Sequence, residues 1–549
     1  MTTLTQSMLD SLANQTFSVT TDYTMNGATL IFNGMTILFN GGTISNGTMQ
    51  LSNCTLSGVA THSINATVVG TLTNSTIYSS WFTRIGQMKF NYTGKTINFD
   101  ENATILDEDD TVKIDQVNHV TFNGMFNTFT CHANFFEIYD NCSYIEIKKF
   151  VAVAQGAPDY GCLSDVISFV RLGTRIYGEE DEIYALYEQA YPRYSINVLH
   201  NSISYFNVGI SLGADVGAKV VVSNVYENSI SYTKGTEAGF GYGIHLANAY
   251  GCKVYDNNLY RTTRHAIYHA WGSGNEITDN TITDHWYGIG LPENSPELVD
   301  QPSRALYKTR AAVAVYRKST SVLVSGNTFI NSYNSSICLT PNPEAIAQIQ
   351  DIRPYGQMND IRLLNNTFTH TGPHDASDSN INHKHPAIKV GGAMNSSEIQ
   401  AGYLINTVKI KNNIFSVSNS DFLTFCHIYQ CFNLEIIENT ITFSSYPFNS
   451  DIIHLLVAFN NANVGLLTMD INASGNVFCS ANTSAQTHVT ISAFSDVSAH
   501  FNTGSQMSIF NNTLSNQTLG GILMYQLYYG FNATAYGPLP SGFYLQLEN

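Results

Sequence analysis

The chain has 549 residues, of which 43% are hydrophobic and 12% are charged, and its formal net charge is −17 at pH 7. Proteins that bind nucleic acid or an anionic membrane surface present clustered basic residues, whereas this chain has 25 Lys and Arg against 42 Asp and Glu. The composition therefore argues against both partners. No stretch approaches the roughly eighteen apolar residues of a membrane helix, so we expect no membrane insertion.

The cysteines and the N-terminus both bear on where the protein is made. The 9 cysteines are scattered and include no Cys-x-x-Cys pair, which predicts buried free thiols rather than disulfides or zinc ligands. Residues 1–17 lack the basic and apolar segments of a signal peptide. We therefore expect synthesis in a reducing cytoplasm, with an exported enzyme whose signal was removed as the alternative.

The first part of the chain differs from the rest. Residues 4–14 have the pattern of a short helix, and we assign residues 1–20 to an N-terminal helical or attachment segment. Residues 21–84 form an Asn-Gly-rich β segment, in which Asn-Gly pairs within 24–58 are separated by alternating apolar residues. Asn-Gly pairs mark tight turns, so this segment predicts short rungs or hairpins.

One phrase recurs through the rest of the chain: alternating apolar residues, an Asn, any residue, and another apolar residue. Its Asn stands at Asn201, Asn228, Asn257, Asn280, Asn327, Asn366, Asn413, Asn439, Asn476 and Asn512. The step of 23 residues from Asn257 to Asn280 is close to one coil of a β-solenoid. Longer steps predict one coil with an inserted loop, or two coils of which one has lost the phrase. Asn tolerates left-handed geometry at a turn, and its amide can bond the equivalent amide one rung away.

A second phrase of five residues is a short alternating strand centred on Ile. It occurs at 208–212, 242–246, 265–269, 287–291, 335–339 and 386–390. Short period-2 strands bounded by Gly, Asn and Ser are typical of coils joined by tight turns. We therefore predict an all-β fold, a parallel β-helix whose strands stack about 4.8 Å apart.

The β-helix is expected to cover residues 85–515. Residues 178–194 interrupt it with an acidic start, helical apolar spacing and Pro192 as a stop, which predicts an inserted helix. The end of a solenoid exposes unpaired strand edges. The aromatic segment 516–549 is therefore predicted to be a C-terminal cap or an oligomerisation tail.

The coil spacing and the Asn phrase resemble the right-handed parallel β-helix proteins of the pectate-lyase-like group. The stretch SSWFTRIG at 79–86 is also similar to the start of phage tailspike β-helices, which often carry Trp-Phe-Gly-Ala-x-Gly-Asp-Gly. Trp81 and Phe82 match that phrase, whereas the residues from Thr83 onward depart from it. The resemblance implies a right-handed β-helix that assembles as a parallel homotrimer.

Aligning the coils on the repeated Asn predicts a row of acids. Glu227, Asp256 and Asp279 precede the Asn on consecutive rungs. Carboxylates this close raise one another's pKa, and a neutral acid beside an ionised one is what glycoside hydrolysis needs. A row of solvated turn residues is the alternative, because Asp and Asn favour turns for backbone reasons.

A second row lies four residues after the Asn and holds Tyr232, Arg261 and Asp284. Arg261 and Asp284 should be neighbours on adjacent rungs. They are expected to form a surface ion pair or, alternatively, to clamp a sugar hydroxyl. We count Asp284 with the candidate catalytic acids.

The strand phrase predicts two outward rows of aromatic and imidazole side chains. They are Tyr242, His265 and Tyr287, and His245, Tyr268 and Gly290, with Trp271 and Trp286 beside them. Sugar rings stack on aromatic faces while their hydroxyls need polar neighbours. These rows, with Arg261, are predicted either to bind a glycan or to decorate a scaffold. His269 aligns with Leu246 and Leu291, which predicts a buried histidine.

The loop 370–386 is rich in His and Asp: His370, His374, Asp375, Asp378, His383 and His385. It contains no ordered metal motif, so we predict a polar surface loop without metal or cofactor, and a metal-binding loop is the alternative. A polysaccharide lyase could use Arg264, Lys389 and Tyr268 as carboxylate ligands and base. The acidic net charge argues against a strongly anionic substrate.

These features predict a phage tailspike or tail-fibre-like virion protein, made in the host cytoplasm, that binds a bacterial surface glycan. Its further partners would be two copies of itself and other tail proteins. The sequence leaves open whether the glycan is also cleaved, and favours a glycoside hydrolase over a lyase. One alternative is an extracellular polysaccharide hydrolase or lyase acting as a monomer, and another is a purely structural virion component.

Overall fold

The computed structural model describes residues 1–139, 141–157, 166–172, 192–213, 219–235, 241–285, 311–332, 335–340, 358–370, 386–391, 405–417, 425–429, 431–443, 450–456, 470–480, 488–495, 505–515, 522–529 and 543–547. The chain forms two compact units, Met1–Phe240 and Gly241–Asn549. Within the described ranges, no helix has the length and apolarity that crossing a bilayer requires.

The first unit begins with a small solenoid of short rungs. Helix α1 (Gln6–Asp10) lies inside the expected 4–14 segment. The strands are β1 (Thr2–Thr3), β2 (Thr16–Val19), β3 (Tyr23–Thr24), β4 (Thr29–Asn33), β5 (Thr36–Phe39), β6 (Ile44–Ser57), β7 (Ile64–Leu72) and β9 (Met88–Phe90). Their pairings are parallel, with Leu30 opposite Met49 and Met49 opposite Val68. The Asn-Gly turns are therefore corners of rungs, and the hairpin alternative is wrong.

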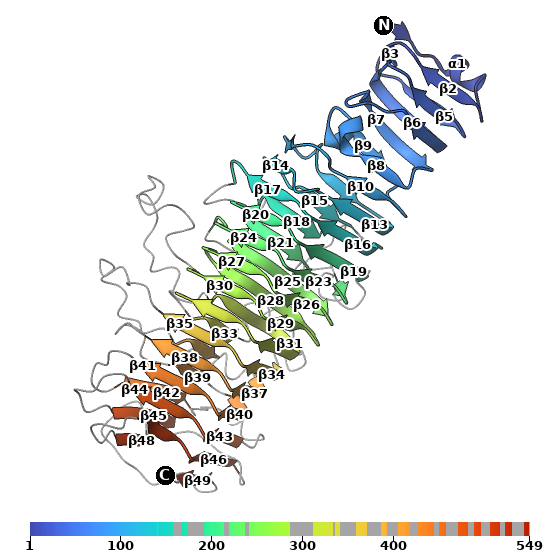
Figure 1. Cartoon of the computed structure of the whole chain (residues 1–549). Helices are drawn as coiled ribbons and strands as arrows, with labels where there is room; N and C mark the ends of the chain where they lie inside the picture. The colour runs from blue at the N-terminus through green and yellow to red at the C-terminus, as the bar shows by residue number, and fades with distance from the viewer. Residues whose placement is uncertain are drawn as a thin grey trace. The chain divides into compact units, whose positions relative to one another are not determined.

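The rest of the first unit is a parallel β-helix with three strand stacks (Figure 1). The first stack is β12 (Val112–Ile114), β15 (Phe136–Ile138), β18 (Ser168–Leu172) and β21 (Val208–Leu212). The second is β8 (Thr76–Tyr78), β10 (Thr96–Asn98), β13 (Asn118–Asn123), β16 (Ser143–Lys148), β19 (Pro192–Leu199), β22 (Lys219–Val221) and β23 (Asn224–Tyr226). The third is β11 (Ala103–Ile105), β14 (Thr128–Cys131), β17 (Val151–Ala154), β20 (Ser202–Ser204) and β24 (Ser229–Ser231).

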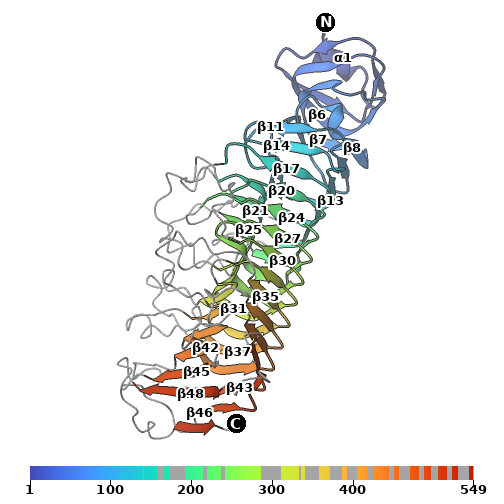
Figure 2. The same cartoon turned by 60° about the vertical axis from the view of Figure 1, so that its left-hand side comes forward.

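The second unit repeats this three-stack coil (Figure 2). Its first stack is β25 (Tyr242–Tyr250), β28 (His265–Ser273), β31 (Val313–Ser325), β33 (Ile337–Thr340), β36 (Ile388–Val390), β39 (Cys426–Tyr429), β42 (Ser450–Leu456), β45 (His488–Ser495) and β48 (Ile522–Tyr529). The second is β26 (Lys253–Tyr255), β29 (Glu276–Thr278), the end of β31, β34 (Asn359–Leu364), β37 (Ile405–Lys411), β40 (Cys431–Ile437), β43 (Asp470–Ser474), β46 (Ser505–Phe510) and β49 (Phe543–Leu547). The third is β27 (Asn258–Tyr260), β30 (Thr281–Thr283), β32 (Thr328–Ile330), β35 (Thr367–His370), β38 (Ile414–Val417), β41 (Thr440–Phe443), β44 (Val477–Ser480) and β47 (Thr513–Ser515).

The protein is thus a right-handed parallel β-helix, the hand that parallel crossovers adopt. Strands β48 and β49 pair in parallel with β45 and β46, so the stacks continue past residue 515, the expected end of the solenoid. The expected helix at 178–194 lies almost wholly outside the described residues, and Pro192 begins strand β19. The role of 516–549 as a cap stays a prediction.

The repeated Asn forms a buried ladder in each unit. In the first unit, Asn201 Nδ2 donates to Asn228 Oδ1 at 2.9 Å. In the second, equivalent bonds run through Asn257, Asn280, Asn327, Asn366, Asn413, Asn439, Asn476 and Asn512. Asn280 bonds Asn327 directly across a separation of 47 residues. That long step is therefore one coil with an insertion, not two coils.

The ladder Asn was expected to adopt the left-handed turn conformation. In the structure, the residue before it adopts this conformation. Glu227, Asp256 and Asp279 have φ of 55°, 55° and 56°. The Asn turns its amide inward to bond the ladder, so the preceding residue makes the corner. Asn, Asp and Gly tolerate this conformation most readily.

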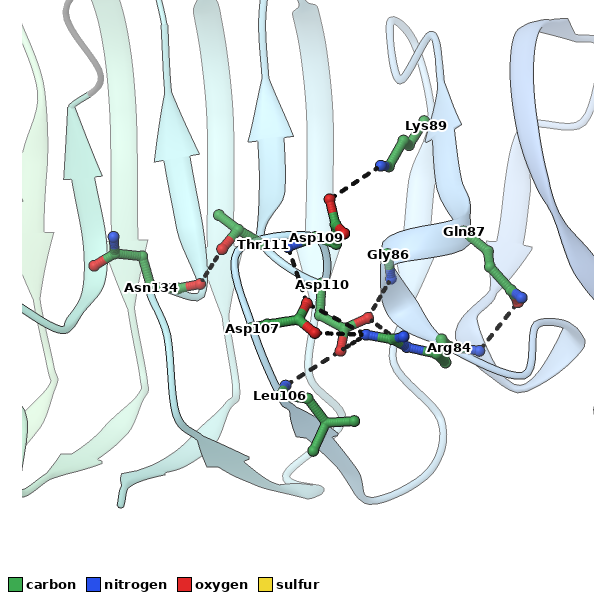
Figure 3. A network of polar contacts seen from close by, with 10 residues as sticks. All are labelled: Arg84, Gly86, Gln87, Lys89, Leu106, Asp107, Asp109, Asp110, Thr111 and Asn134. Atoms are coloured by element: carbon green, nitrogen blue, oxygen red, sulfur yellow. Dashed lines mark hydrogen bonds and ion pairs between the residues drawn. The ribbon is translucent and has the colours of Figure 1, made fainter. Parts of the chain in front are cut away.

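An ionic clamp holds the stretch at 79–86 in place (Figure 3). Arg84 donates from Nη2 and Nε to the Asp110 carboxylate at 2.7 and 3.1 Å. The Asp110 side chain is 2% exposed and also accepts from the backbone N–H groups of Gly86 and Leu106, both at 3.2 Å. A Cβ on Gly86 would lie 2.2 Å from the Asp109 carbonyl oxygen, so only glycine fits there.

The described cysteines are free thiols, as expected. Seven are buried and Cys479 is half-buried. Burial raises the pKa of Cys131, Cys426 and Cys431 well above the usual thiol range. These side chains act as small apolar core residues.

Candidate functional site

The predicted acids lie at exposed corners. Asp256 and Asp279 are exposed on adjacent rungs of the second unit, each directly before a ladder Asn. Glu227 belongs to the first unit, where its carboxylate lies 2.9 Å from Nδ1 of His200, and both side chains are 44% exposed. The backbone is left-handed at all three positions. Because this conformation favours Asp and Asn, a catalytic role is not needed to explain the acids at these corners. Their catalytic role stays a prediction.

Arg261 and Asp284 are paired across adjacent rungs, as expected. Arg261 Nε lies 3.7 Å from Asp284 Oδ2, with the side chains 22% and 18% exposed. Asn331 on the next rung donates to Asp284 Oδ1 at 3.0 Å. The guanidinium carbon of Arg261 lies 5.1 Å from the centre of the Tyr260 ring. These contacts hold the corner that follows the third stack, and the Asp284 carboxylate contacts both Arg261 and Asn331.

The strand register confirms part of the predicted outward rows. Tyr242 pairs with His265, and His245 pairs with Tyr268. The next rung is β31, in which Ala314 pairs with Tyr268. The prediction that Tyr287 and Gly290 continue the rows is therefore wrong, because β28 pairs directly with β31. Tyr287, Gly290 and Trp286 themselves lie outside the described residues.

The rings of these rows form a tight cluster rather than an exposed platform. The rings of Tyr242 and Tyr268 stack at 5.1 Å with an interplanar angle of 10°, and the Tyr242 and His265 rings lie 5.5 Å apart. Tyr242, Tyr268 and His265 are 6%, 8% and 2% exposed. The three side chains are therefore packed against one another and do not form the flat outward platform that the sequence predicts. His245 is half-buried.

Two further side chains complete the cluster. The Tyr316 ring lies 5.3 Å from the Tyr268 ring, and the guanidinium carbon of Arg264 lies 5.2 Å from the centre of the Tyr242 ring. Nδ1 of His265 is 2.7 Å from the carbonyl oxygen of Ala311. Burial raises the pKa of Tyr316 well above the usual phenol range. We call Tyr242, His245, His265, Tyr268, Tyr316 and Arg264 the ring cluster.

The register extends the His245–Tyr268 row beyond the ring cluster. Ala314 pairs with Cys338, and Cys338 pairs with Lys389. Burial raises the pKa of Cys338, while the positive charge of Lys389 and a bond to Thr340 oppose the rise. Cys338 Sγ lies 3.2 Å from Thr340 Oγ1. Lys389 is half-buried, and its charge therefore acts on the same row as Tyr268.

Sequence reasoning did not place Cys338 and Lys389 in this row, although the signal was present. Both follow the central Ile of the five-residue phrase, at Ile337 and Ile388, as His245 and Tyr268 do. Tyr316 gave no such signal, because the strand around it lacks the phrase. The sequence predicts a role for Lys389 only in the lyase alternative, as a ligand of the substrate carboxylate.

His269 is buried in the inward row, as predicted. It lies between Leu246 and Val315 in the register. Asn275 Nδ2 can only donate, so Nε2 of His269 accepts its bond at 2.8 Å, and Nδ1 donates to Ser319 Oγ at 3.1 Å. Burial lowers the pKa of His269 to about 4. His269 is therefore a neutral structural residue.

The remaining predicted groups contribute little to a site. Trp271 is 7% exposed, with a left-handed φ of 63°. The histidine-rich loop lies outside the described residues except for His370, which ends strand β35. Among the residues that the structure describes, no three His, Cys, Asp or Glu side chains are positioned to hold a metal ion.

Comparisons with known proteins concern the fold. Residues 221–351 match the family described as "Periplasmic copper-binding protein (NosD)". No curated protein matches the sequence. Because the family match spans less than half of the chain, it is a similarity of one segment.

Three solved structures are similar over most of the chain. The surface protein and adhesin PfbA of Streptococcus pneumoniae is 11% identical, with a TM-score of 0.38, over 78% of this chain and 91% of that one. The A-module of mannuronan C-5 epimerase AlgE6 from Azotobacter vinelandii is 10% identical, with a TM-score of 0.36, over 66% and 87%. ORF18 of Geobacillus virus E2 is 10% identical, with a TM-score of 0.25, over 78% and 55%. The parallel register of its own strands identifies this chain as a β-helix.

Proposed function

We propose that this protein binds a bacterial surface polysaccharide along the outward face of the first strand stack of its second unit. The supporting observation is the row His245, Tyr268, Ala314, Cys338 and Lys389, which runs over consecutive rungs beside the stacked rings. Strands spaced about 4.8 Å apart make such a row linear, which suits an extended polymer. Its half-buried members, His245 and Lys389, stand at the two ends of the row, and the three residues between them are buried.

The chemistry of this face fits a glycan. Aromatic rings offer faces and edges to the C–H surfaces of sugars, and histidine, hydroxyl and cationic groups bond hydroxyls and acidic substituents. The half-buried members, His245, Arg264, Tyr316 and Lys389, would make the contacts. The fully packed rings, Tyr242, Tyr268 and His265, would hold them in position.

The biological setting that we propose is a phage tail. Coil repeats that resemble tailspike β-helices, free cysteines and an aromatic C-terminal segment support a homotrimeric virion protein that joins other tail proteins. An extracellular enzyme acting as a monomer and a purely structural virion component are the alternatives.

The binding test uses capsular polysaccharide and lipopolysaccharide purified from the host bacterium. In affinity electrophoresis, we expect the wild type to be retarded and Lys389→Ala to bind about tenfold more weakly, a loss of roughly 1.4 kcal/mol. The matched control is Lys253→Ala, because Lys253 is a 49% exposed lysine on the second stack of the same unit. Equal binding by both variants, or no retardation of the wild type, would contradict the proposal.

A second candidate function is cleavage of a uronate-bearing glycan by β-elimination. The observation that favours it is that the ring cluster brings Arg264 and Tyr268 against the same ring, that of Tyr242. A cation would neutralise the uronate carboxylate and a tyrosine or histidine would remove the proton beside it. Elimination leaves an unsaturated product, whereas hydrolysis leaves a new reducing end, so assays for the two products distinguish lyase from hydrolase.

A further inference from the structure

A row of exposed residues lies at one corner of the first unit, near the start of the second strand stack. Asn118 pairs with Ser143, and Ser143 pairs with Tyr194. His119 and Tyr144 follow the first two of these residues, and their rings stack with centroids 4.4 Å apart at 15°. Tyr144 is 55% exposed and Tyr194 is 47% exposed. We call these five residues the corner strip.

The backbone of this corner is poorly suited to aromatic residues. His119 and Tyr144 have φ of 55° and 53°, a left-handed conformation that favours Gly and Asn. On the preceding rung the same corner is Gly94, with φ of 73°, whose N–H bonds the carbonyls of Asn118 and His119 at 3.0 and 2.8 Å. The corner thus carries Gly94 on one rung, His119 on the next rung and Tyr144 on the rung after that.

Packing does not offset the backbone cost at Tyr144. More than half of this side chain is exposed, and it contacts the His119 ring instead of the core. An exposed ring held in a disfavoured conformation lowers stability, and such costs are typical of binding sites.

The other members of the strip are polar, because Asn118, Ser143 and Tyr194 have amide and hydroxyl groups. Ser143 Oγ donates to Asn118 Oδ1 at 2.7 Å. This bond fixes the orientation of the Asn118 side-chain amide. One face of Tyr144 is covered by His119, and the following rung has the small Ser195 at the corner, with φ of 54°. Among the described residues, the next rung therefore places no ring at this corner beyond Tyr144, and its Tyr194 pairs with Ser143 beside the corner.

We propose that the corner strip is a carbohydrate-binding site, separate from the face in the second unit, that takes an uncharged sugar ring on the open face of Tyr144. The ring supplies the stacking surface, and Asn118, Ser143 and Tyr194 supply hydrogen-bond partners for the hydroxyls. The strip contains no Asp, Glu, Lys or Arg, so its ligand is a neutral segment of a polysaccharide rather than an acidic one.

The test measures stability and binding on the same variant of the full chain. Tyr144→Asn places a favoured residue at the left-handed corner, so we expect the thermal midpoint to rise by about 2 °C. In affinity electrophoresis in gels containing dextran, mannan, galactan or amylose, we expect at least one to retard the wild type. Tyr144→Asn should then bind about five- to tenfold more weakly.

Three controls separate ring stacking from other effects. Gln116→Asn makes the same kind of change at an exposed left-handed position, φ 53°, of another corner, and should leave binding unchanged. Tyr144→Phe keeps the stacking face and should retain binding within about twofold. Lys253→Ala should leave binding to neutral polysaccharide unchanged, because Lys253 belongs to the second unit and lies outside both proposed binding faces.

The proposal is overturned if none of the four polysaccharides retards the wild type, or if Tyr144→Asn binds as well as the wild type. Equal loss in Gln116→Asn or Lys253→Ala would also overturn it. If the corner strip binds a protein instead, none of the polysaccharide gels should retard the wild type.

Discussion

At the scale of single residues, two buried histidines of the second unit link stability to pH. His269 accepts a bond at Nε2. His285 donates from Nε2 to the Arg264 carbonyl at 3.1 Å, and its buried Nδ1 has no partner. Burial lowers the pKa of both residues from 6.5 to about 4. A second proton on His269 would displace the bond from Asn275, and one on Nδ1 of His285 would be buried without an acceptor.

We therefore predict that stability falls as pH drops from about 6.5 to 4. The unfolded chain binds protons at these histidines over that range and the folded chain does not, at a cost of roughly 3 kcal/mol per histidine. Above pH 6.5 the effect is absent. Urea unfolding at pH 7 and pH 4.5 checks it: His269→Gln should lose less stability on acidification than the wild type, whereas His62→Gln, at a 51% exposed site, should lose the same amount. Parallel losses in all three proteins would contradict the prediction.

The acids Asp256 and Asp279 give a second prediction at this scale. If a glycan-cleaving activity is present and these are its carboxylates, Asp256→Asn and Asp279→Asn should each lower the turnover rate by at least about a hundredfold, the usual size of a general acid or base contribution. Asn tolerates the left-handed corner as well as Asp does, so the thermal midpoint should not change. Reducing-end release measures the rate. Unchanged rates in both variants would assign the acids to turn formation alone.

At the scale of elements, the Asn ladder ties each coil to the next. Asn280 donates from Nδ2 to the carbonyls of Val254 and Thr278, both at 2.9 Å, and to Asn327 Oδ1. Its own Oδ1 accepts from the backbone and side chain of Asn257 at 3.1 and 2.9 Å. Hydrophobic alternation sets which face is buried, whereas the ladder sets how successive coils align.

Removing one ladder amide should therefore destabilise the second unit. Asn280→Ala leaves the buried carbonyls of Val254 and Thr278 and the N–H of Asn257 without this partner, at an expected cost of about 2–4 kcal/mol. The matched control is Asn258→Ala, because Asn258 is an exposed residue next to a ladder Asn. Urea unfolding monitored by circular dichroism measures the difference. A ladder variant no less stable than the control would contradict the role of the ladder.

The clamp at Arg84 and Asp110 is the second device at this scale. Asp110 accepts bonds from Arg84, Gly86 and Leu106 while its side chain is almost fully buried. We predict that Asp110→Ala destabilises the first unit by about 3 kcal/mol, because these donors lose a charged acceptor. Asp107→Ala, which removes a 56% exposed partner of the same arginine, should cost less than about 1 kcal/mol. Similar thermal midpoints for both variants would contradict a structural clamp.

At the scale of the whole molecule, the open question is assembly. A β-helix must protect the strand edges at its ends, and strands β48 and β49 are the last that the structure describes in their stacks. We predict a homotrimer in solution. Light scattering coupled to size exclusion should give a mass three times the 60.5 kDa of the chain, and a monomer at micromolar concentration would rule out the tailspike proposal.

Much of the fold was predictable from the sequence because it is set by local repetition. The Asn phrase and the Ile-centred phrase recur with each coil, and a parallel solenoid places equivalent residues side by side. His269 could be assigned to the core in this way, and Arg261 could be paired with Asp284. The Ile-centred phrase at 287–291 led to a wrong row assignment. The strand that pairs with β28 is β31, which follows a long insertion in the sequence.

The sequence by itself determined the coil, the inward and outward alternation, and the residues that form the Asn ladder, since each follows from hydrophobic periodicity and turn chemistry. Only the tertiary structure decided which strand follows β28, how deeply the ring cluster is packed, and that Tyr316 joins that cluster. Those outcomes depend on contacts between residues separated by insertions of variable length. No local pattern specifies such contacts.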